Sequence, residues 1–391
     1  MVRPLPWAQQ LLGAERAWPT STGAGITVAV IDSGVDADHP QLRTAGKVLP
    51  GRDFFLVGRL AGNYDCVSHG TEVAGLIAAE PAAGIGFHGI APGARILPVR
   101  VADRETEENG GTRVVDPTVL ANGIIYAVNQ GASVINLSLS GQRDHQVVRN
   151  AIAYAVRKDV VVVAAVGNRQ TPEGGSLCSY PAAYPGVLGV GATDMSGARV
   201  HGSQIGSYVD LMAPGEGVLS STRVSGHAYV SGTSFAAPFV AATAALVRSA
   251  WPRLTAAQVV QRLQATATPA RGGVTGQEYG AGIVDPYRAV TEDLASATAK
   301  VPKATETPID ASVLARQHWW GDAASRTRRL AGLAVASAAA LTLLGVALSA
   351  GRRRRWLAAR SSIARTAAEH PKDQAAGAGL PLPEHLFGRQ P

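Results

Sequence analysis

Three short motifs in this 391-residue chain carry residue types that can together perform nucleophilic catalysis. Ser234 lies in Gly-Thr-Ser-Phe-Ala-Ala-Pro, where a helix is expected to begin and small neighbours leave the hydroxyl accessible. A serine hydroxyl is a weak nucleophile and needs a neighbouring base, which His69 in His-Gly-Thr-Glu-Val-Ala-Gly can supply. Asp32 follows an apolar run and can fix the imidazole tautomer and stabilise the imidazolium. The three motifs predict a nucleophile, a base and an orienting acid.

An asparagine can complete such a site. Asn168 follows the apolar run 160–166 and Gly167, so its side-chain amide is expected at the carboxyl end of a strand. There the amide can donate to the oxyanion of a tetrahedral intermediate, with the backbone N–H of Ser234 as the second donor. The alternative for Asn168 is a simple turn residue. The alternative for the whole set is an inactive relative, against which the four intact residues argue.

The elements that must position these residues are short buried strands alternating with helices. Continuous β-branched runs, typical of strands buried on both faces of a parallel sheet, are found at 26–31, 96–101, 133–139 and 160–166. Helical patterns are found at 71–79, 117–129, 146–157, 234–250 and 255–266. This alternation predicts an α/β fold, a doubly wound sandwich with a mainly parallel central sheet. In such a sheet the site lies at the carboxyl ends of the strands.

The motifs and their order, Asp then His then Ser, resemble those of the subtilases, the subtilisin-like serine proteases. The resemblance covers about residues 26–290 and rests on DSGVDADHPQL, HGTEVAGLIAA, NLSLSG, VGN and SGTSFAAPFVAATAALV. It implies a serine endopeptidase that works through an acyl-enzyme and needs no cofactor. It also implies that Ser138, Leu139 and Ser140 line the substrate cleft and pair with the substrate backbone as an added strand. Many subtilases carry glycine in place of Ser140, so we expect its side chain to narrow the primary specificity pocket.

Other polar residues near the motifs are expected to be structural. His39 belongs to the turn after the Asp motif, and His69 already fills the role of the base. Four acids could bind calcium, but they lack the spacing of a calcium loop and are expected to be solvated: Asp36, Asp38, Asp65 and Asp103. No metal site is predicted.

The chain has two cysteines, Cys66 and Cys178, which allow one disulfide. Both lie in loop-like sequence rather than in an apolar run. The subtilase pattern places both loops at the catalytic edge of the sheet, and a Cys66–Cys178 disulfide is predicted, which requires an oxidising compartment. Free thiols are the alternative. A nucleophilic Cys66 is disfavoured, because Ser234 has the full helix-start context.

Composition divides the chain into a protease domain and a membrane anchor. An N-terminal extension (1–25) precedes the predicted peptidase domain (26–291), and a linker rich in Ala, Thr, Lys, Pro and Asp follows at 292–329. Residues 330–350 carry no charge and are long enough for a transmembrane helix. A buried core helix would show a polar face, which this segment lacks. The tail 351–391 is basic and is expected to be disordered and cytoplasmic.

The charge distribution predicts the orientation of this anchor. The tail carries eight Lys/Arg and three acids, so 8 − 3 = +5 of the net charge of +7 belongs to it, and no basic face for nucleic acid is expected. Six arginines follow the apolar segment closely and three precede it. The positive-inside rule then predicts a single-pass cell-membrane protein with an extracytoplasmic catalytic domain. No signal peptide is evident, so we expect that the native chain begins upstream of Met1 or that its signal has been removed.

A narrower resemblance is to the mycosins, the membrane-anchored subtilases of actinobacterial type VII secretion systems. Cys66 stands three residues before His69, and an apolar segment with an arginine cluster follows the protease domain. Mycosins also keep a short N-terminal extension in place of a folding pro-domain. The resemblance implies protein or peptide substrates and a type VII secretion membrane complex as a partner. Two alternatives stay open: a structural subunit that stabilises a secretion complex with secondary proteolysis, and a housekeeping surface subtilase.

Overall fold

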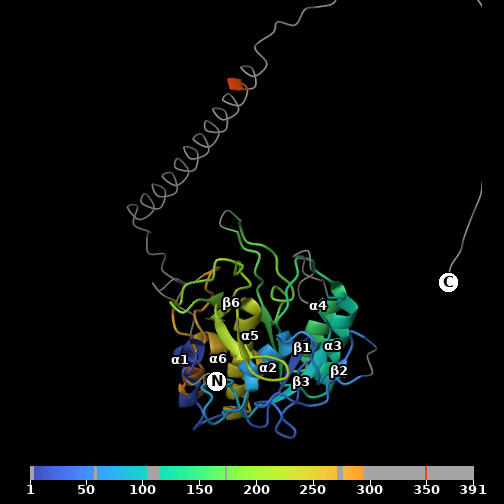
Figure 1. Ribbon diagram of the computed structural model, residues 1–391, viewed down its shortest axis with the longest axis vertical. Helices are drawn as coiled ribbons and strands as arrows, with labels where there is room; N and C mark the ends of the chain where they lie inside the picture. Colours follow the sequence, from blue (N-terminus) through green and yellow to red (C-terminus); the bar gives the residue numbers. More distant parts are fainter. Residues whose placement is uncertain are drawn as a thin grey trace, which may run out of the picture. The chain divides into compact units, whose positions relative to one another are not determined.

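The central element of the fold is a parallel sheet of seven strands in the order β2-β3-β1-β4-β5-β6-β7 (Figure 1). The computed structural model describes residues 4–56, 60–103, 115–171, 174–270, 276–294 and 348–349. The strands are β1 (Thr27–Asp32), β2 (Arg52–Asp53), β3 (Arg95–Arg100), β4 (Val134–Leu137), β5 (Val161–Ala165), β6 (Val187–Thr193) and β7 (Leu211–Pro214). Strand order reverses beside β1, which is flanked by β3 and β4. This is the predicted doubly wound α/β fold.

Helices cover both faces of the sheet. They are α1 (Trp7–Leu12), the 3₁₀ turn η1 (Ala14–Arg16), α2 (His69–Ala78), α3 (Pro117–Asn129), α4 (Gln146–Arg157), α5 (Thr233–Ala250), α6 (Ala256–Ala265) and α7 (Pro286–Thr291). Alternate residues of β1 enter different cores: Val28 and Val30 pack with α2 and α5, whereas Ala29 and Ile31 pack with α3 and α4. The strands are therefore buried on both faces, as their continuous apolar runs predict.

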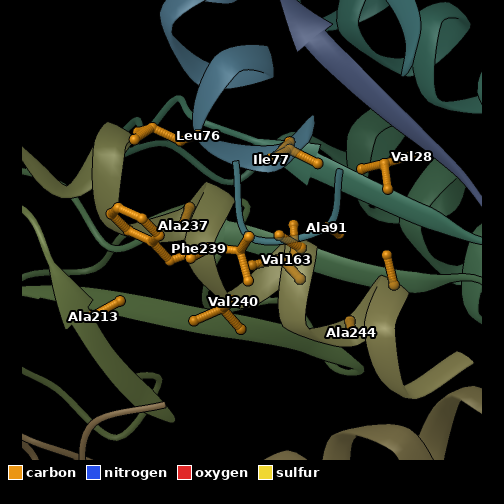
Figure 2. Close-up of a cluster of buried hydrophobic side chains, with 14 of the residues drawn as sticks. Val28, Leu76, Ile77, Ala91, Val163, Ala213, Ala237, Phe239, Val240 and Ala244 are labelled. Atoms are coloured by element: carbon orange, nitrogen blue, oxygen red, sulfur yellow. The ribbon is translucent and has the colours of Figure 1, made fainter. Parts of the chain in front are cut away.

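Helix α5 lies at the centre of the larger core. Its side chains Ala237, Phe239 and Val240 lie between α2, represented by Leu76, and the sheet, represented by Val163 (Figure 2). Many of its core positions are alanine, and short side chains let a helix approach its neighbours closely. The first turn of α5, which carries Ser234, therefore begins a helix that is buried along most of its length.

A two-stranded antiparallel hairpin leads into α5. It consists of β8 (Val218–Ser221) and β9 (His227–Val230), with Val218 paired to Val230. The N-terminal extension is also part of the core: Ala8 and Leu12 of α1 are fully or almost fully buried. The Trp7 indole donates to the carbonyl of Gly217, just before β8.

The predicted anchor at 330–350 lies outside the described residues, apart from Leu348 and Ser349. Within the part of the chain that the structure describes, no helix combines the length and apolar character needed to span a bilayer.

Candidate active site

The acid and the base are brought together at the carboxyl edge of the sheet. Asp32 is the last residue of β1 and His69 is the first residue of α2. Their side chains are buried, and His69 Nδ1 lies 2.7 Å from Asp32 Oδ1. The same oxygen accepts the backbone N–H of Ser33 at 2.7 Å, which holds the carboxylate in place. The carboxylate fixes the proton of a neutral imidazole on Nδ1, so Nε2 is the nitrogen that can act as a base.

A glycine permits this close approach of helix and strand. A Cβ atom on Gly70 would lie 1.9 Å from the carbonyl oxygen of Gly34. No larger residue fits between the start of α2 and the end of β1. This explains why the His motif needs glycine directly after the imidazole.

The start of α2 is held by a carboxylate that the sequence does not single out. The N-cap residue Ser68 has φ 80° and makes no side-chain cap bond. Asp65 takes over this role: its Oδ2 accepts the backbone N–H of Thr71 at 2.9 Å, and its Oδ1 accepts the hydroxyl of Ser33 at 3.1 Å. The side chain thus joins the helix of the base to the strand of the acid. Asp65 is only 8% exposed, so the expectation that it is solvated is wrong.

Ser234 occupies the second position of α5. Its neighbour Phe235 packs edge-on against the imidazole of His69, with ring centroids 5.2 Å apart. The Ser234 hydroxyl donates to the carbonyl of Ser138 at 3.2 Å. The first N–H groups of a helix have no intrahelical acceptor, so the start of α5 presents donors and a favourable field for developing negative charge.

Asn168 is exposed near the start of the loop that follows β5, and its amide has a defined orientation. Its Oδ1 accepts the backbone N–H of Thr233 at 2.9 Å, and Thr233 Oγ1 accepts the N–H of Gly167 at 3.1 Å. Because the amide oxygen faces a donor, the amide nitrogen is the other terminal atom. That nitrogen would lie 3.2 Å from a Cβ on Gly232, two residues before Ser234. The site therefore offers a side-chain N–H donor close to the nucleophile.

The three residues expected to line the cleft differ in exposure. Ser138 is 1% exposed, Leu139 is half-buried, and Ser140 is exposed. Ser140 Oγ would lie 2.9 Å from a Cβ on Gly167, so this side chain packs against the loop that carries Asn168. The segment 138–140 is thus buried at Ser138 and becomes exposed at Ser140, next to the loop of the candidate oxyanion donor.

The predicted Cys66–Cys178 disulfide is wrong, because both cysteines are free and exposed. Cys66 follows Asp65, which forms an isolated bridge with Gly34 just beyond β1. Cys178 lies two residues before Tyr180, which forms an isolated bridge with Gly141 beyond β4. Both cysteines therefore lie on loops beyond the carboxyl ends of neighbouring strands, but no disulfide joins them.

The remaining predictions concern His39 and the acids. His39 is buried, and its Nδ1 accepts the N–H of Gln41 while Nε2 faces the carbonyl of Gly226, which is a structural role. Asp103 bonds to the guanidinium of Arg100. Within the described residues, no group of three or more His, Cys, Asp or Glu side chains could hold a metal ion.

Arg100 is a supporting residue that sequence reasoning missed. It is 1% exposed, bonds to Asp53 at 2.8 Å and donates to the carbonyl of Ser33 at 3.0 Å. It lies directly opposite Asp32 in the β1–β3 register. The only sequence signal is a charged residue at the end of an otherwise apolar strand.

Comparisons with known proteins match most of the chain to one family. The model of the Subtilase family matches residues 23–282. The chain is 41% identical over 276 residues to a thermophilic serine proteinase of Bacillus sp. (strain AK1), covering 70% of this chain and 64% of the relative. It therefore spans less than two thirds of that relative.

Two further comparisons point to the mycosins. The chain is 35% identical over 349 residues to mycosin-1 of Mycobacterium tuberculosis, covering 76% of this chain and 75% of the relative. The solved MycP3 protease from the type VII (ESX-3) secretion system superposes with a TM-score of 0.63 at 35% identity, covering 74% of this chain and 89% of that one.

Proposed function

Because this chain belongs to the subtilase family, we propose that it is a serine endopeptidase with the triad Asp32, His69 and Ser234. The observation that carries the proposal is the buried Asp32–His69 pair at 2.7 Å, with the helix start of Ser234 packed against the imidazole through Phe235. The family match supports the reaction class, and this arrangement supports the role that we propose for each residue.

In the proposed mechanism His69 Nε2 takes the proton of Ser234 as the hydroxyl oxygen bonds to the scissile carbonyl carbon. The carbonyl oxygen becomes an oxyanion, which accepts hydrogen bonds from the Asn168 amide and the Ser234 backbone N–H. The intermediate collapses, the C–N bond breaks, and His69 gives its proton to the leaving amine. Water, activated by the same imidazole, then attacks the acyl-enzyme and releases the acid product and Ser234. No cofactor is needed.

Substrates of this reaction are protein or peptide segments in an extended conformation. We propose that segment 138–140 binds them as an added strand. Its position between the helix start of Ser234 and the loop of Asn168 supports this role. The side chain of Ser140, which lies against Gly167 in the loop of Asn168, would narrow the primary specificity pocket.

A fluorophosphonate probe tests the triad without knowledge of the natural substrate. The full-length chain, purified in detergent, should be labelled on the peptide that contains Ser234. Ser234→Ala should abolish labelling, and His69→Ala should slow it by at least about 1,000-fold. Labelling of a well-folded protein at another residue, or none, would contradict the assignment.

We further propose that residues 330–350 anchor the protease to the cell membrane, with the catalytic domain extracytoplasmic and the tail 351–391 cytoplasmic. The likeness to mycosin-1 and MycP3 supports a role beside a type VII secretion complex. Protease added to intact cells should digest the catalytic domain and spare a C-terminal epitope tag. A catalytic domain that is protected until lysis would reverse the orientation.

A chromosomal Ser234→Ala variant separates catalysis from a structural role in secretion. If secretion continues while cleavage stops, the complex needs the protein and not its activity. If both stop, proteolysis itself is required. Unchanged secretion in a complete deletion strain would instead favour a housekeeping surface protease.

A further inference from the structure

The helix of the candidate nucleophile contains a proline that frees one backbone carbonyl. Pro238 lies in α5, four residues after Ser234. In a regular helix the N–H of residue 238 would bond to the carbonyl of Ser234, but proline has no N–H. Pro238 is buried with most of α5. A carbonyl in such surroundings needs another donor, because leaving it unpaired is costly.

Ser138 supplies that donor. Its hydroxyl donates to the Ser234 carbonyl at 2.6 Å. The buried amide of Asn136, in β4, donates to the same hydroxyl oxygen at 2.9 Å. With one lone pair of the oxygen taken by Asn136, the hydroxyl proton is directed at Ser234. The sheet therefore provides, through a side chain, the bond that the helix cannot make for itself.

The contact between Ser138 and Ser234 is reciprocal. The Ser234 hydroxyl donates to the Ser138 carbonyl at 3.2 Å, while the Ser138 hydroxyl donates to the Ser234 carbonyl. We propose that Ser138 is a positioning residue for the nucleophile. Its hydroxyl replaces the helical hydrogen bond that Pro238 cannot donate, and it fixes the position of Ser234 relative to β4. This goes beyond the cleft-lining role expected for Ser138 and rests on Ser234 being the nucleophile.

A variant that restores the helical donor distinguishes this role from a contact with substrate. Ser138→Ala should slow fluorophosphonate labelling of the full-length chain about 10-fold, the effect of one lost hydrogen bond of typical strength. Pro238→Ala restores a backbone N–H that can donate to the Ser234 carbonyl. This variant should be labelled at a rate within about 3-fold of the wild-type rate. In the Pro238→Ala background, Ser138→Ala should then have little further effect on the labelling rate. Such non-additivity is the signature of a shared interaction.

Ser21→Ala is a matched control. The Ser21 hydroxyl is buried and donates to the Leu246 carbonyl at 2.8 Å, a bond of the same kind to the other end of α5. Its loss should lower the melting temperature about as much as Ser138→Ala does, with an unchanged labelling rate. This separates helix stability from the position of the nucleophile.

The outcomes are decisive in each case. If Ser138→Ala is labelled at the wild-type rate, the positioning role is overturned while the triad stands. The same holds if Ser138→Ala lowers the labelling rate equally with and without Pro238→Ala. If Ser138→Ala alone does not fold, recovery of folding and labelling in Ser138→Ala/Pro238→Ala supports the proposal, and failure to recover overturns it. Labelling away from Ser234 in the wild type refutes the triad instead, independently of Ser138.

Discussion

Replacing Asp65 by alanine should loosen the helix of the base from the strand of the acid. One carboxylate oxygen accepts the N–H groups of Val67 and Ser68 at 3.0 and 3.1 Å and the Ser33 hydroxyl at 3.1 Å. The other accepts both the N–H and the hydroxyl of Thr71, at 2.9 and 2.6 Å. Asp65 thus accepts five hydrogen bonds, and every donor lies within two residues of Asp32 or His69.

The cost can be worked from these contacts. Losing a helix cap costs about 1 kcal/mol, and each further buried donor left unpaired costs about 1–3 kcal/mol. Part of this loss is offset. Burial, and to a lesser extent the neighbouring charge of Asp32, raises the pKa of Asp65, which means that its charge is unfavourable in the folded protein, and alanine removes that charge. We expect a net loss of about 2–3 kcal/mol. Gly70 N–H also bonds to the Ser33 hydroxyl, so the imidazole should shift and labelling should slow about 10- to 100-fold.

Thermal melts and fluorophosphonate labelling measure the two effects. Asp65→Asn keeps one acceptor oxygen and should fall between the wild type and Asp65→Ala in both assays. Asp116 is the matched control, since it caps the exposed start of α3 by accepting the N–H groups of Thr118 and Val119. Asp116→Ala should lose about 1 kcal/mol and label normally. If Asp65→Ala behaves like Asp116→Ala in both assays, the reasoning is refuted.

Three further predictions concern separate parts of the site and core. Asn168→Ala should lower peptide hydrolysis about 100- to 1,000-fold and, because its Oδ1 also accepts the Thr233 N–H, should cost about 1 kcal/mol of stability; a loss of activity below 10-fold would show that the amide does not bind the oxyanion. Arg100→Met leaves the Asp53 carboxylate buried without its cation and should cost about 3–5 kcal/mol in urea unfolding, most of which Asp53→Asn should restore. Burial raises the pKa of Asp210 to about 6, so the native state holds the proton more tightly and stability should fall as pH rises from about 4 to about 6. Asp210→Asn should remove this slope in melts at pH 4.5 and 7; an unchanged slope would assign it elsewhere.

The strands and helices with strong patterns could be predicted from the sequence. The run 26–31 corresponds to β1 (Thr27–Asp32), and the pattern 255–266 corresponds to α6 (Ala256–Ala265), whose Thr255 forms a capping box. Strand β6 was missed because glycines interrupt its apolar run. The reason is tertiary: a Cβ on Gly189 would lie 1.9 Å from the Tyr208 carbonyl oxygen, so a neighbouring loop, not strand propensity, selects glycine there.

The candidate site divides in the same way. The types and order of Asp32, His69 and Ser234 suggest their chemistry because nucleophilic catalysis needs those side chains together. The supporting residues carry no such signal. Asp65 reads as a surface acid in a polar loop, and its burial depends on the approach of α2 to β1, which only the folded chain shows.

The roles of Asp65, Asn168 and Ser138 follow from one rule of hydrogen bonding near helix starts. A helix that begins at a buried site leaves backbone groups that water cannot reach, so other side chains must pair with them. At α2 the Asp65 carboxylate takes the Thr71 N–H, and at α5 the Asn168 amide oxygen takes the Thr233 N–H. Because Pro238 has no N–H, the Ser234 carbonyl in α5 loses its usual helical donor, and it accepts the Ser138 hydroxyl instead. Because the proposed catalytic groups lie in these same first turns, we expect the side chains that pair with the backbone there also to set the position of the proposed base and nucleophile.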